Sequence, residues 1–307
     1  MEDRYIPNTH SRQDYLPLTE APESCVRRAV EHIVADAPPR PKYNHRHCHG
    51  LFSGPTALAF LLLRVGSIYP TMKIGDHSLR YWANLYISAR RIGASSSRCG
   101  LTSEIAGLGT VKTLLDRNNA PTLLRELNET MRNTQHPHEL LYGSAGLLYM
   151  IRLVESWQPV LTSSFADIKK RIIDRIIAAG PDWTWHQKRY IGVAHGDVGI
   201  LTQLILTDPN LATGSFANNK LDRLLNLQQS DGNWPAKEGE GGEGKRLMQI
   251  CHGAPGFVVS LESLRPFFPK WADRIDGAIT RGRNAIWEEG LLRKEPCLCH
   301  GILGNAL

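Results

Sequence analysis

The sequence predicts an all-α fold, an α/α toroid with an inner ring of buried helices inside an outer ring of amphipathic ones. Two observations predict it: a Gly-x-x-Gly tetrad recurs along the chain, and an apolar helical run follows most copies. Successive closing glycines lie 39 to 57 residues apart, a spacing that fits one helical hairpin per repeat. Strand-like alternations are few. The clear tetrads begin at Gly143, Gly196, Gly253 and Gly301.

The inner helices are expected directly after the tetrads. The runs 147–151, 200–206 and 257–261 are apolar on almost every side, as in helices that are buried all round. The segments between them are amphipathic, and residues 165–179 carry isoleucines at helical spacing. If each tetrad opens an inner helix, all tetrads gather at one end of the barrel. Free backbone N–H groups and helix dipoles there favour anions such as thiolates.

Two further copies of the repeat are degraded. Residues 102–107 replace the first glycine with Ser103, and residues 51–54 retain only Gly54, which we align with the closing glycines. We expect one domain over residues 1–307. Only three residues follow Gly304, so the last layer of the ring is expected to be missing. Apolar faces left uncovered in this way would favour self-association and low stability.

The composition excludes several classes of protein. A hydrophobic content of 42% and a charged content of 21% indicate a globular chain with a real core. The net charge of +6 is spread without a basic stripe, which argues against nucleic-acid partners. No apolar run reaches the length of a membrane helix, and the N-terminus has no signal-peptide core. Six cysteines without framework spacing favour a reducing, cytoplasmic location.

Two Cys-His-Gly triplets, 251–253 and 299–301, overlap the last two tetrads. Cys251, Cys299 and His300 would supply two sulfurs and one nitrogen from neighbouring repeats. Three protein ligands with an open fourth position are typical of catalytic zinc, which can hold an incoming thiol as thiolate.

Other metal ligands remain possible. His252 is a candidate fourth ligand, and free thiols at all these positions are the alternative without metal. The cluster at 45–49, with three histidines and Cys48, resembles a metal site, but we expect a solvated loop there. Cys25, Cys48 and Cys99 are expected to be bystanders. Cys297 lies two residues before Cys299, and a decoy thiol near the metal is the alternative reading that we do not adopt for it.

These motifs resemble the lanthionine synthetase C-like family over essentially the whole chain. The zinc signatures are similar at 250–256 and 299–306, and so is the block 190–196 with Trp185-His186 before it. Further blocks match at 139–143 and 232–235, and Arg4-x-x-Pro7-Asn8 resembles the start of the eukaryotic branch. One departure is Ile250, where the family usually has tryptophan.

The resemblance implies an α/α toroid of seven layers around one zinc ion. It also implies zinc ligands at Cys251, Cys299 and His300, and an acid/base role for His195. Glu139 matches a functional acid of bacterial members. Lys294 and Arg4 match residues that contact glutathione in the eukaryotic branch. The alternatives are a helix-capping role for His195, a capping or salt-bridging role for Glu139, and ordinary surface positions for both cations.

The function expected from the resemblance is zinc-dependent addition of the glutathione thiol to dehydroamino acids in proteins or peptides. Michael addition needs a thiolate and a proton donor for the enolate, which zinc and His195 would supply. One alternative is a non-catalytic adaptor that binds zinc or glutathione, or a degenerate paralogue. Another is a peptide thioether cyclase. Protein prenyltransferases share the toroid and zinc, but their ligand set includes a carboxylate.

Overall fold

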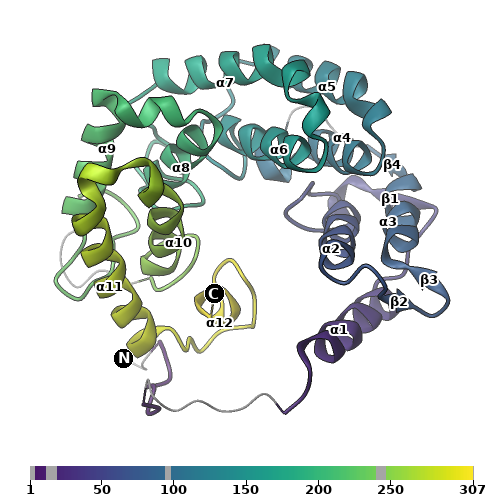
Figure 1. Cartoon of the computed structure of the whole chain (residues 1–307), viewed down its shortest axis with the longest axis horizontal. Coiled ribbons are helices and arrows are strands. Elements are labelled where there is room, and N and C mark those ends of the chain that lie inside the picture. Colours follow the sequence, from purple (N-terminus) through teal and green to yellow (C-terminus); the bar gives the residue numbers. More distant parts are fainter. Residues whose placement is uncertain (1–3, 12–18, 94–97, 240–246, 307) are drawn as a thin grey trace. The chain divides into compact units, whose positions relative to one another are not determined.

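The computed structural model describes residues 4–11, 19–93, 98–239 and 247–306 (Figure 1). Within these ranges the chain is mainly helical, which confirms the all-α prediction. None of the described helices is long and apolar enough to cross a membrane. The α-helices are α1 (Pro22–Asp36), α2 (Pro55–Ile68), α3 (Leu79–Ser88), α4 (Glu104–Leu115), α5 (Ala120–Arg132), α6 (Ser144–Trp157), α7 (Ala166–Ala178), α8 (Asp197–Thr207), α9 (Ser215–Asn226), α10 (Ala254–Leu264), α11 (Ala272–Glu289) and α12 (Ile302–Asn305).

The chain divides into two compact units. The first comprises Met1–His10, Pro137–Tyr149 and Lys169–Leu307, and the second comprises Ser11–His136 and Met150–Ile168. All the candidate site residues from the sequence, from Arg4 to His300, belong to the first unit. That residues 1–307 form one domain stays a prediction.

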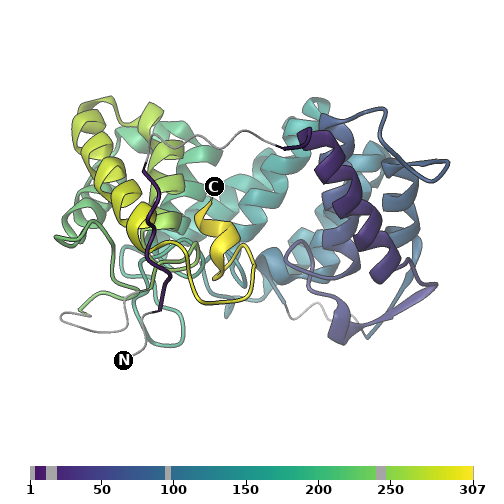
Figure 2. The ribbon, with the colours of Figure 1, turned by 90° about the horizontal axis from the view of Figure 1, so that it is seen from below.

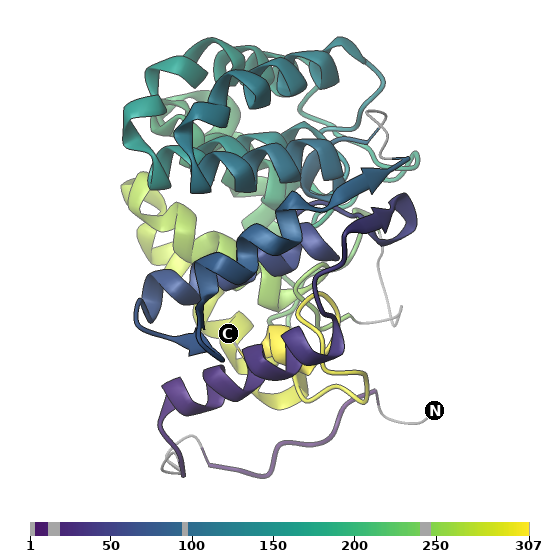
Figure 3. The same ribbon diagram turned by 90° about the vertical axis from the view of Figure 1, so that its right-hand side faces the viewer.

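The second unit packs α2 against α3 and α4, and α4 against α5. Its strands are short. β1 (Lys42–Asn44) pairs in parallel with β4 (Arg90–Ile92), with Lys42 opposite Arg90 (Figure 3). β2 (Lys73–Ile74) and β3 (His77–Ser78) form an antiparallel pair. A buried Glu104 at the start of α4 accepts hydrogen bonds from Gly50 N–H at 2.9 Å and from Arg91 at 2.6 Å.

The first unit alternates buried and amphipathic helices, as the sequence predicts. Nearly every residue of α8 and α10 is buried, whereas α9 and α11 bury one face. α10 packs against both α8 and α11. In Figure 2, α10 and α11 lie side by side, and both are yellow-green. Trp234 stacks on Phe257 of α10 with ring centroids 4.4 Å apart, at the centre of this core.

The inner helices begin directly after the first glycine of each tetrad. Gly196, Gly253 and Gly301 occupy the N-cap positions of α8, α10 and α12. Gly54 caps α2 with φ of +88°, close to the +114° of Gly253. Gly54 therefore has the position of an opening glycine, not the closing position that its sequence context suggested.

A buried ion pair fixes the start of α8 in the first unit. Asp197 accepts a hydrogen bond from Lys220 Nζ of α9 at 2.6 Å, and both side chains are almost completely buried. Lys220 also donates to the carbonyl of Pro181 and lies 4.9 Å from the ring centroid of Trp183. Burial raises the pKa of Asp197, while Lys220 opposes that shift. Removing one partner would leave an uncompensated charge in the core.

We expect Lys220→Met to lower the free energy of unfolding by about 3–5 kcal/mol at neutral pH, because Asp197 then loses its buried counter-ion. Urea unfolding measures the change. The matched control is Lys170→Met on α7, whose partner Asp174 lies 2.6 Å away in an exposed pair. Exposed pairs contribute about 0.2–1 kcal/mol. Equal losses in the two variants would show that the Asp197 pair does not stabilise the core.

Candidate active site

Two cysteines from neighbouring tetrads meet in the first unit. Cys251 precedes α10 and Cys299 precedes α12, and Cys251 N–H donates to the carbonyl of Cys299 at 3.1 Å. The two thiols also shift each other's pKa, that of Cys251 upward and that of Cys299 downward. Cys251 is buried and Cys299 is partly exposed. One sulfur is therefore held within the protein while its neighbour remains accessible from solvent.

Glycine allows the loops that carry these cysteines to fold so tightly. A Cβ at Gly253, where φ is +114°, would lie 2.0 Å from the carbonyl oxygen of Leu247. A Cβ at Gly301 would lie 2.0 Å from the carbonyl oxygen of Glu295 and 2.5 Å from the nitrogen of Cys297. Any side chain at either position would push the loop away from its helix.

The sulfur pair shares one proton. A hydrogen bond from Cys251 lowers the pKa of Cys299 to about 5; burial opposes this shift, and His300 and His195 reinforce it. The same hydrogen bond, together with burial, raises the pKa of Cys251. The two shifts favour a thiolate at Cys299 and a neutral thiol at Cys251. The thiolate of Cys299, and then Glu295, raise the pKa of His300.

Cys251, Cys299 and His300 offer the sulfur and nitrogen donors that zinc binds, and each shifts the pKa of a neighbour in the set. In the described part of the chain, however, the ligand atoms of these three residues do not all lie within 4.8 Å of one another. Zinc prefers thiolate and imidazole ligands, and its binding displaces the protons that such groups carry. A different group in the described residues also has metal-ligand character: ligand atoms of Glu295, Cys297 and His300 lie within 4.8 Å of one another. His300 belongs to both sets.

His195 and Glu139 form a hydrogen-bonded pair beside the sulfurs. His195 Nδ1 lies 2.9 Å from Glu139 Oε2, and the Glu139 side chain is only 2% exposed. Glu139 also accepts from the backbone N–H groups of Leu141 and Tyr142. With its oxygens accepting from these donors, the carboxylate accepts from His195, so Nδ1 carries the proton and Nε2 is left for other partners.

Trp185 holds the His195 ring in place from one face. Their ring centroids are 3.8 Å apart and their planes differ by 1°. A two-residue turn presents Trp185: its backbone pairs with Lys188, and His186 and Gln187 between them have φ of +48° and +60°. Left-handed conformations are costly for residues with side chains, by about 1–3 kcal/mol each. Stacking of Trp185 on His195 offsets part of this cost, since such a ring pair contributes about 0.5–1.5 kcal/mol.

Other rings extend this stack. Tyr142 lies 6.0 Å from both Trp185 and His195 and is nearly parallel to both. Tyr190 lies 5.3 Å from His252, and the His252 ring is 6.0 Å from that of His195. The His195 ring is therefore surrounded by aromatic side chains and hydrogen-bonded to the Glu139 carboxylate.

Arg4 and Lys294 line one small pocket, together with Gln249 and Glu289. The N-terminal segment reaches it by pairing with the chain after α11: Ile6 N–H donates to Leu291 at 2.7 Å, and Arg293 N–H donates to Arg4 at 3.0 Å. The pocket adjoins the sulfur pair, because the Cys251 thiol donates to Gln249 at 3.5 Å. Lys294 also lowers the pKa of Cys251 against the dominant upward shift.

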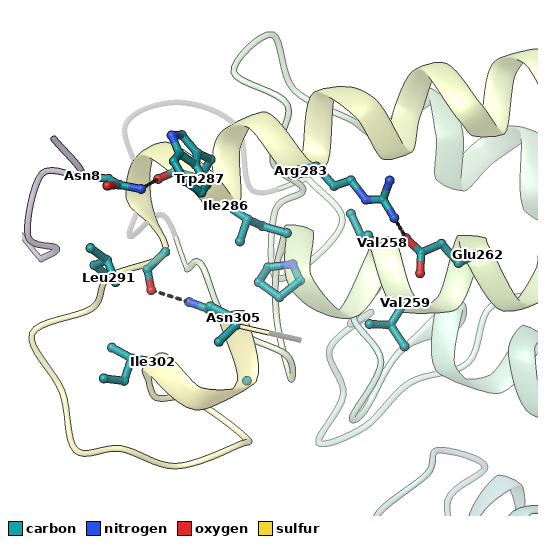
Figure 4. A pocket seen from close by; sticks show the side chains of 14 residues that line it. Asn8, Val258, Val259, Glu262, Arg283, Ile286, Trp287, Leu291, Ile302 and Asn305 are labelled. Carbon is teal, nitrogen blue, oxygen red and sulfur yellow. Dashed lines mark hydrogen bonds and ion pairs between the residues drawn. The ribbon is translucent and has the colours of Figure 1, made fainter. Parts of the chain in front are cut away.

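A larger, apolar groove lies on the same unit between α10, α11 and α12, with a volume of about 480 Å³ (Figure 4). Val258, Ile286 and Ile302 line its walls, and an ion pair between Arg283 and Glu262 lies at 2.6 Å on its α10 side. No cysteine or histidine is among its lining residues. Its chemistry is therefore that of an apolar contact surface, distinct from the sulfur site.

The sequence predictions concern residues of the tetrads and their family blocks, and they leave out several neighbours of these residues. Trp185 was noted only as part of a motif, and the cluster of Glu295 and Cys297 with His300 was not anticipated. The 45–49 segment is largely exposed, but Cys48 within it is buried, and burial raises the pKa of its thiol to about 11. Its sulfur donates to the carbonyl of Asn44 at 3.3 Å, so it packs as a structural thiol.

Replacing Trp185 with leucine should move the ring-proton resonances of His195 downfield, because the stacked indole shields them. Histidine-labelled protein and two-dimensional carbon–proton spectra measure the shift, with His195→Asn used for assignment. Trp287→Leu is the control, since Trp287 on α11 is 37% exposed and lines the apolar groove instead. If Trp185→Leu leaves the His195 resonances in place, the stacked arrangement is not populated in solution.

Comparison with known proteins places the chain in a family. The sequence profile of the lanthionine synthetase C-like proteins matches residues 47–307. Glutathione S-transferase LANCL1 of Danio rerio is 30% identical over 292 residues, covering 85% of this chain and 68% of the relative. LanC-like protein GCL1 of Arabidopsis thaliana is 28% identical over 181 residues, or 55% of this chain and 41% of the relative.

A solved structure shares the fold. Nisin cyclase superposes with a TM-score of 0.68 at 16% sequence identity, over 92% of this chain and 80% of the other. At this identity the similarity concerns the fold alone, and it agrees with the helical architecture expected from the glycine tetrads. Together with the sequence matches, it shows that the chain belongs to the lanthionine synthetase C-like family.

Proposed function

We propose that this chain adds the thiol of glutathione to dehydroamino acid residues in proteins or peptides. The observation that carries the proposal is the proximity of an acid/base pair to a thiolate. His195, hydrogen-bonded to Glu139 at 2.9 Å, lies close enough to Cys299 to lower its pKa. The zebrafish relative, by name a glutathione S-transferase, supports the choice of thiol.

Cys251, Cys299 and His300 would hold the zinc ion of this reaction. Bound zinc would supply a Lewis acid that keeps an incoming thiol deprotonated near neutral pH. The chain's own contribution is a pair of sulfurs that already share a single proton, because one hydrogen bond favours the thiolate at Cys299 and the thiol at Cys251.

His195 is suited to deliver the proton that the addition requires. As the glutathione sulfur forms a bond to the β-carbon, the π electrons of the double bond move toward the carbonyl and an enolate develops. The α-carbon then takes up one proton. Glu139 fixes the Nδ1 tautomer and stabilises a positive ring, so the proton would leave from Nε2. Trp185 limits the ring to one orientation by stacking on its face.

Arg4 and Lys294 would bind the carboxylates of the tripeptide. Both line the pocket that adjoins Cys251 through Gln249. Two cations beside the sulfur pair suit a free thiol that carries two carboxylates, because each cation can pair with one of them. The pocket has a volume of only about 20 Å³ and is also lined by Glu289, so a bound tripeptide would extend beyond it.

The direct test incubates purified protein with zinc, glutathione and a peptide containing one dehydroalanine. Addition of one glutathione is scored by the mass of the product. A second peptide, carrying both dehydroalanine and cysteine, scores ring closure. A glutathione adduct supports the proposal. Ring closure alone would identify a thioether cyclase, and binding of zinc and glutathione without either product would identify a non-catalytic adaptor.

We expect Cys299→Ala to lose most of the zinc that the wild-type protein retains, about one ion per chain, since a three-ligand site loses one of its two sulfurs. Metal content after gel filtration measures the loss. The control is Cys48→Ala, which removes a buried thiol of the second unit that donates to Asn44. Equal zinc content in the two variants would contradict the ligand assignment.

His195→Asn should retain zinc but slow glutathione addition by roughly 10²-fold or more, the usual scale for loss of a general acid. Asparagine keeps a donor near Glu139 without an exchangeable proton of suitable acidity. The mass-based assay gives the rate, and metal content is measured on the same sample. An unchanged rate would assign His195 a structural role.

A further inference from the structure

The loop that carries Cys299 contains a second set of potential metal ligands. Glu295, Cys297 and His300 each offer one ligand atom, and these atoms lie within 4.8 Å of one another. The ring nitrogen Nε2 of His300 lies 2.9 Å from Glu295 Oε1. The backbone N–H of His300 donates to Cys297 Sγ at 3.4 Å. Carboxylate, thiolate and imidazole together form a ligand set that zinc accepts.

The backbone of this loop brings the three residues together. Gly301 N–H donates to the carbonyl of Cys297 at 3.2 Å, which closes a tight turn. The backbone of Glu295 and Cys297 lies so close to Gly301 that a side chain at position 301 would clash with both. The convergence of Glu295 and His300 is therefore a consequence of the fold and not of free side-chain motion alone.

This set differs from the Cys251 and Cys299 pair in its exposure. The Glu295 side chain is 65% exposed and that of His300 is 44% exposed, whereas Cys251 is buried. Zinc bonds of about 2.0–2.3 Å require ligand atoms less than 4.8 Å apart, so the three groups must move closer together to share an ion. Rotation of an exposed carboxylate can supply the difference at little cost. A cation from solvent would meet this outer set before it reached the buried sulfur.

We propose that Glu295, Cys297 and His300 form an outer site for a divalent cation of the zinc type, and that this site shares His300 with the sulfur pair. An ion bound at the outer site passes inward when His300 and the Cys251 and Cys299 sulfurs take over its coordination. No bond within the protein is made or broken in this exchange, and the displaced thiol protons go to water. The proposal concerns metal acquisition; it rests on the zinc site proposed above but not on the thiol addition.

Cobalt(II) is the probe, because its charge-transfer absorption rises with the number of thiolate ligands. The variant Cys251→Ser/Cys299→Ser removes both inner sulfurs. We expect it to bind cobalt with the absorption of a single thiolate, and adding Cys297→Ser should abolish that band. Adding Cys25→Ser instead is the control, since Cys25 is an exposed thiol on α1 of the second unit. Glu295→Gln should weaken binding by about 10- to 100-fold.

A kinetic measurement on an otherwise intact site covers the case in which the double variant does not fold. The metal-free Cys297→Ser protein should take up cobalt several-fold more slowly than the wild type, and reach the same final content. Circular dichroism checks the fold of every variant. The proposal is overturned if a folded double variant shows no thiolate band, or if its band survives Cys297→Ser. It is also overturned if Cys297→Ser leaves the uptake rate unchanged, which would limit Glu295 to orienting His300.

Discussion

The close approach of backbone to backbone at the helix starts is the constraint on which the site depends. Cys251 and Cys299 lie 48 positions apart in the chain, and the bond from Cys251 N–H to the Cys299 carbonyl brings them together. Gly253 and Gly301 leave no room for a side chain where the loops turn into α10 and α12. A methyl group at either glycine would overlap a carbonyl oxygen, so the constraint is steric before it is chemical.

That geometry determines the charge of the site. Two neighbouring thiols cannot both ionise easily in a partly buried place, so ionisation of one favours the neutral form of the other. His300 and His195 favour the negative charge at Cys299, while burial favours a protonated Cys251. The negative charge is thus favoured at Cys299 because it is more exposed than Cys251, although the two occupy equivalent positions in their repeats. A symmetric ring of identical repeats would not distinguish them.

The sequence predicts those parts of the site that belong to the repeat. Tetrad spacing places Cys251, Cys299 and His195 at equivalent helix starts, and in the structure the backbones of Cys251 and Cys299 are in contact. The partner of His195 was also among the candidates, because Glu139 belongs to a recognisable block. In each case a local pattern was sufficient, since glycine at the N-cap fixes where the helix begins. Gly54 shows the limit: a single glycine in a degraded copy does not reveal which position of the tetrad it occupies.

The neighbours of these residues were not predictable in the same way. Trp185 stacks on His195 next to a turn in which His186 and Gln187 adopt left-handed conformations, and the pair lacks the Asn-Gly or Asp-Gly signature of a two-residue turn. The parallel pairing of β1 with β4 joins strands of three residues each that carry no alternating pattern. Contacts of this kind depend on the packing of the whole unit and leave no periodic trace in the sequence.

His300 belongs to both groups of residues that the tight loop at Gly301 brings together. The same turn that sets Cys299 beside Cys251 also folds Glu295 and Cys297 back toward the His300 ring. An imidazole between a thiolate and a carboxylate is stabilised as a cation by both, and each raises its pKa. Metal binding must remove that proton, so any cation that reaches His300 competes with a hydrogen bond to Glu295 at 2.9 Å. The carboxylate thereby restrains the ring when no metal is bound, and it can accept the ring N–H once an ion lies at the Cys251 and Cys299 sulfurs.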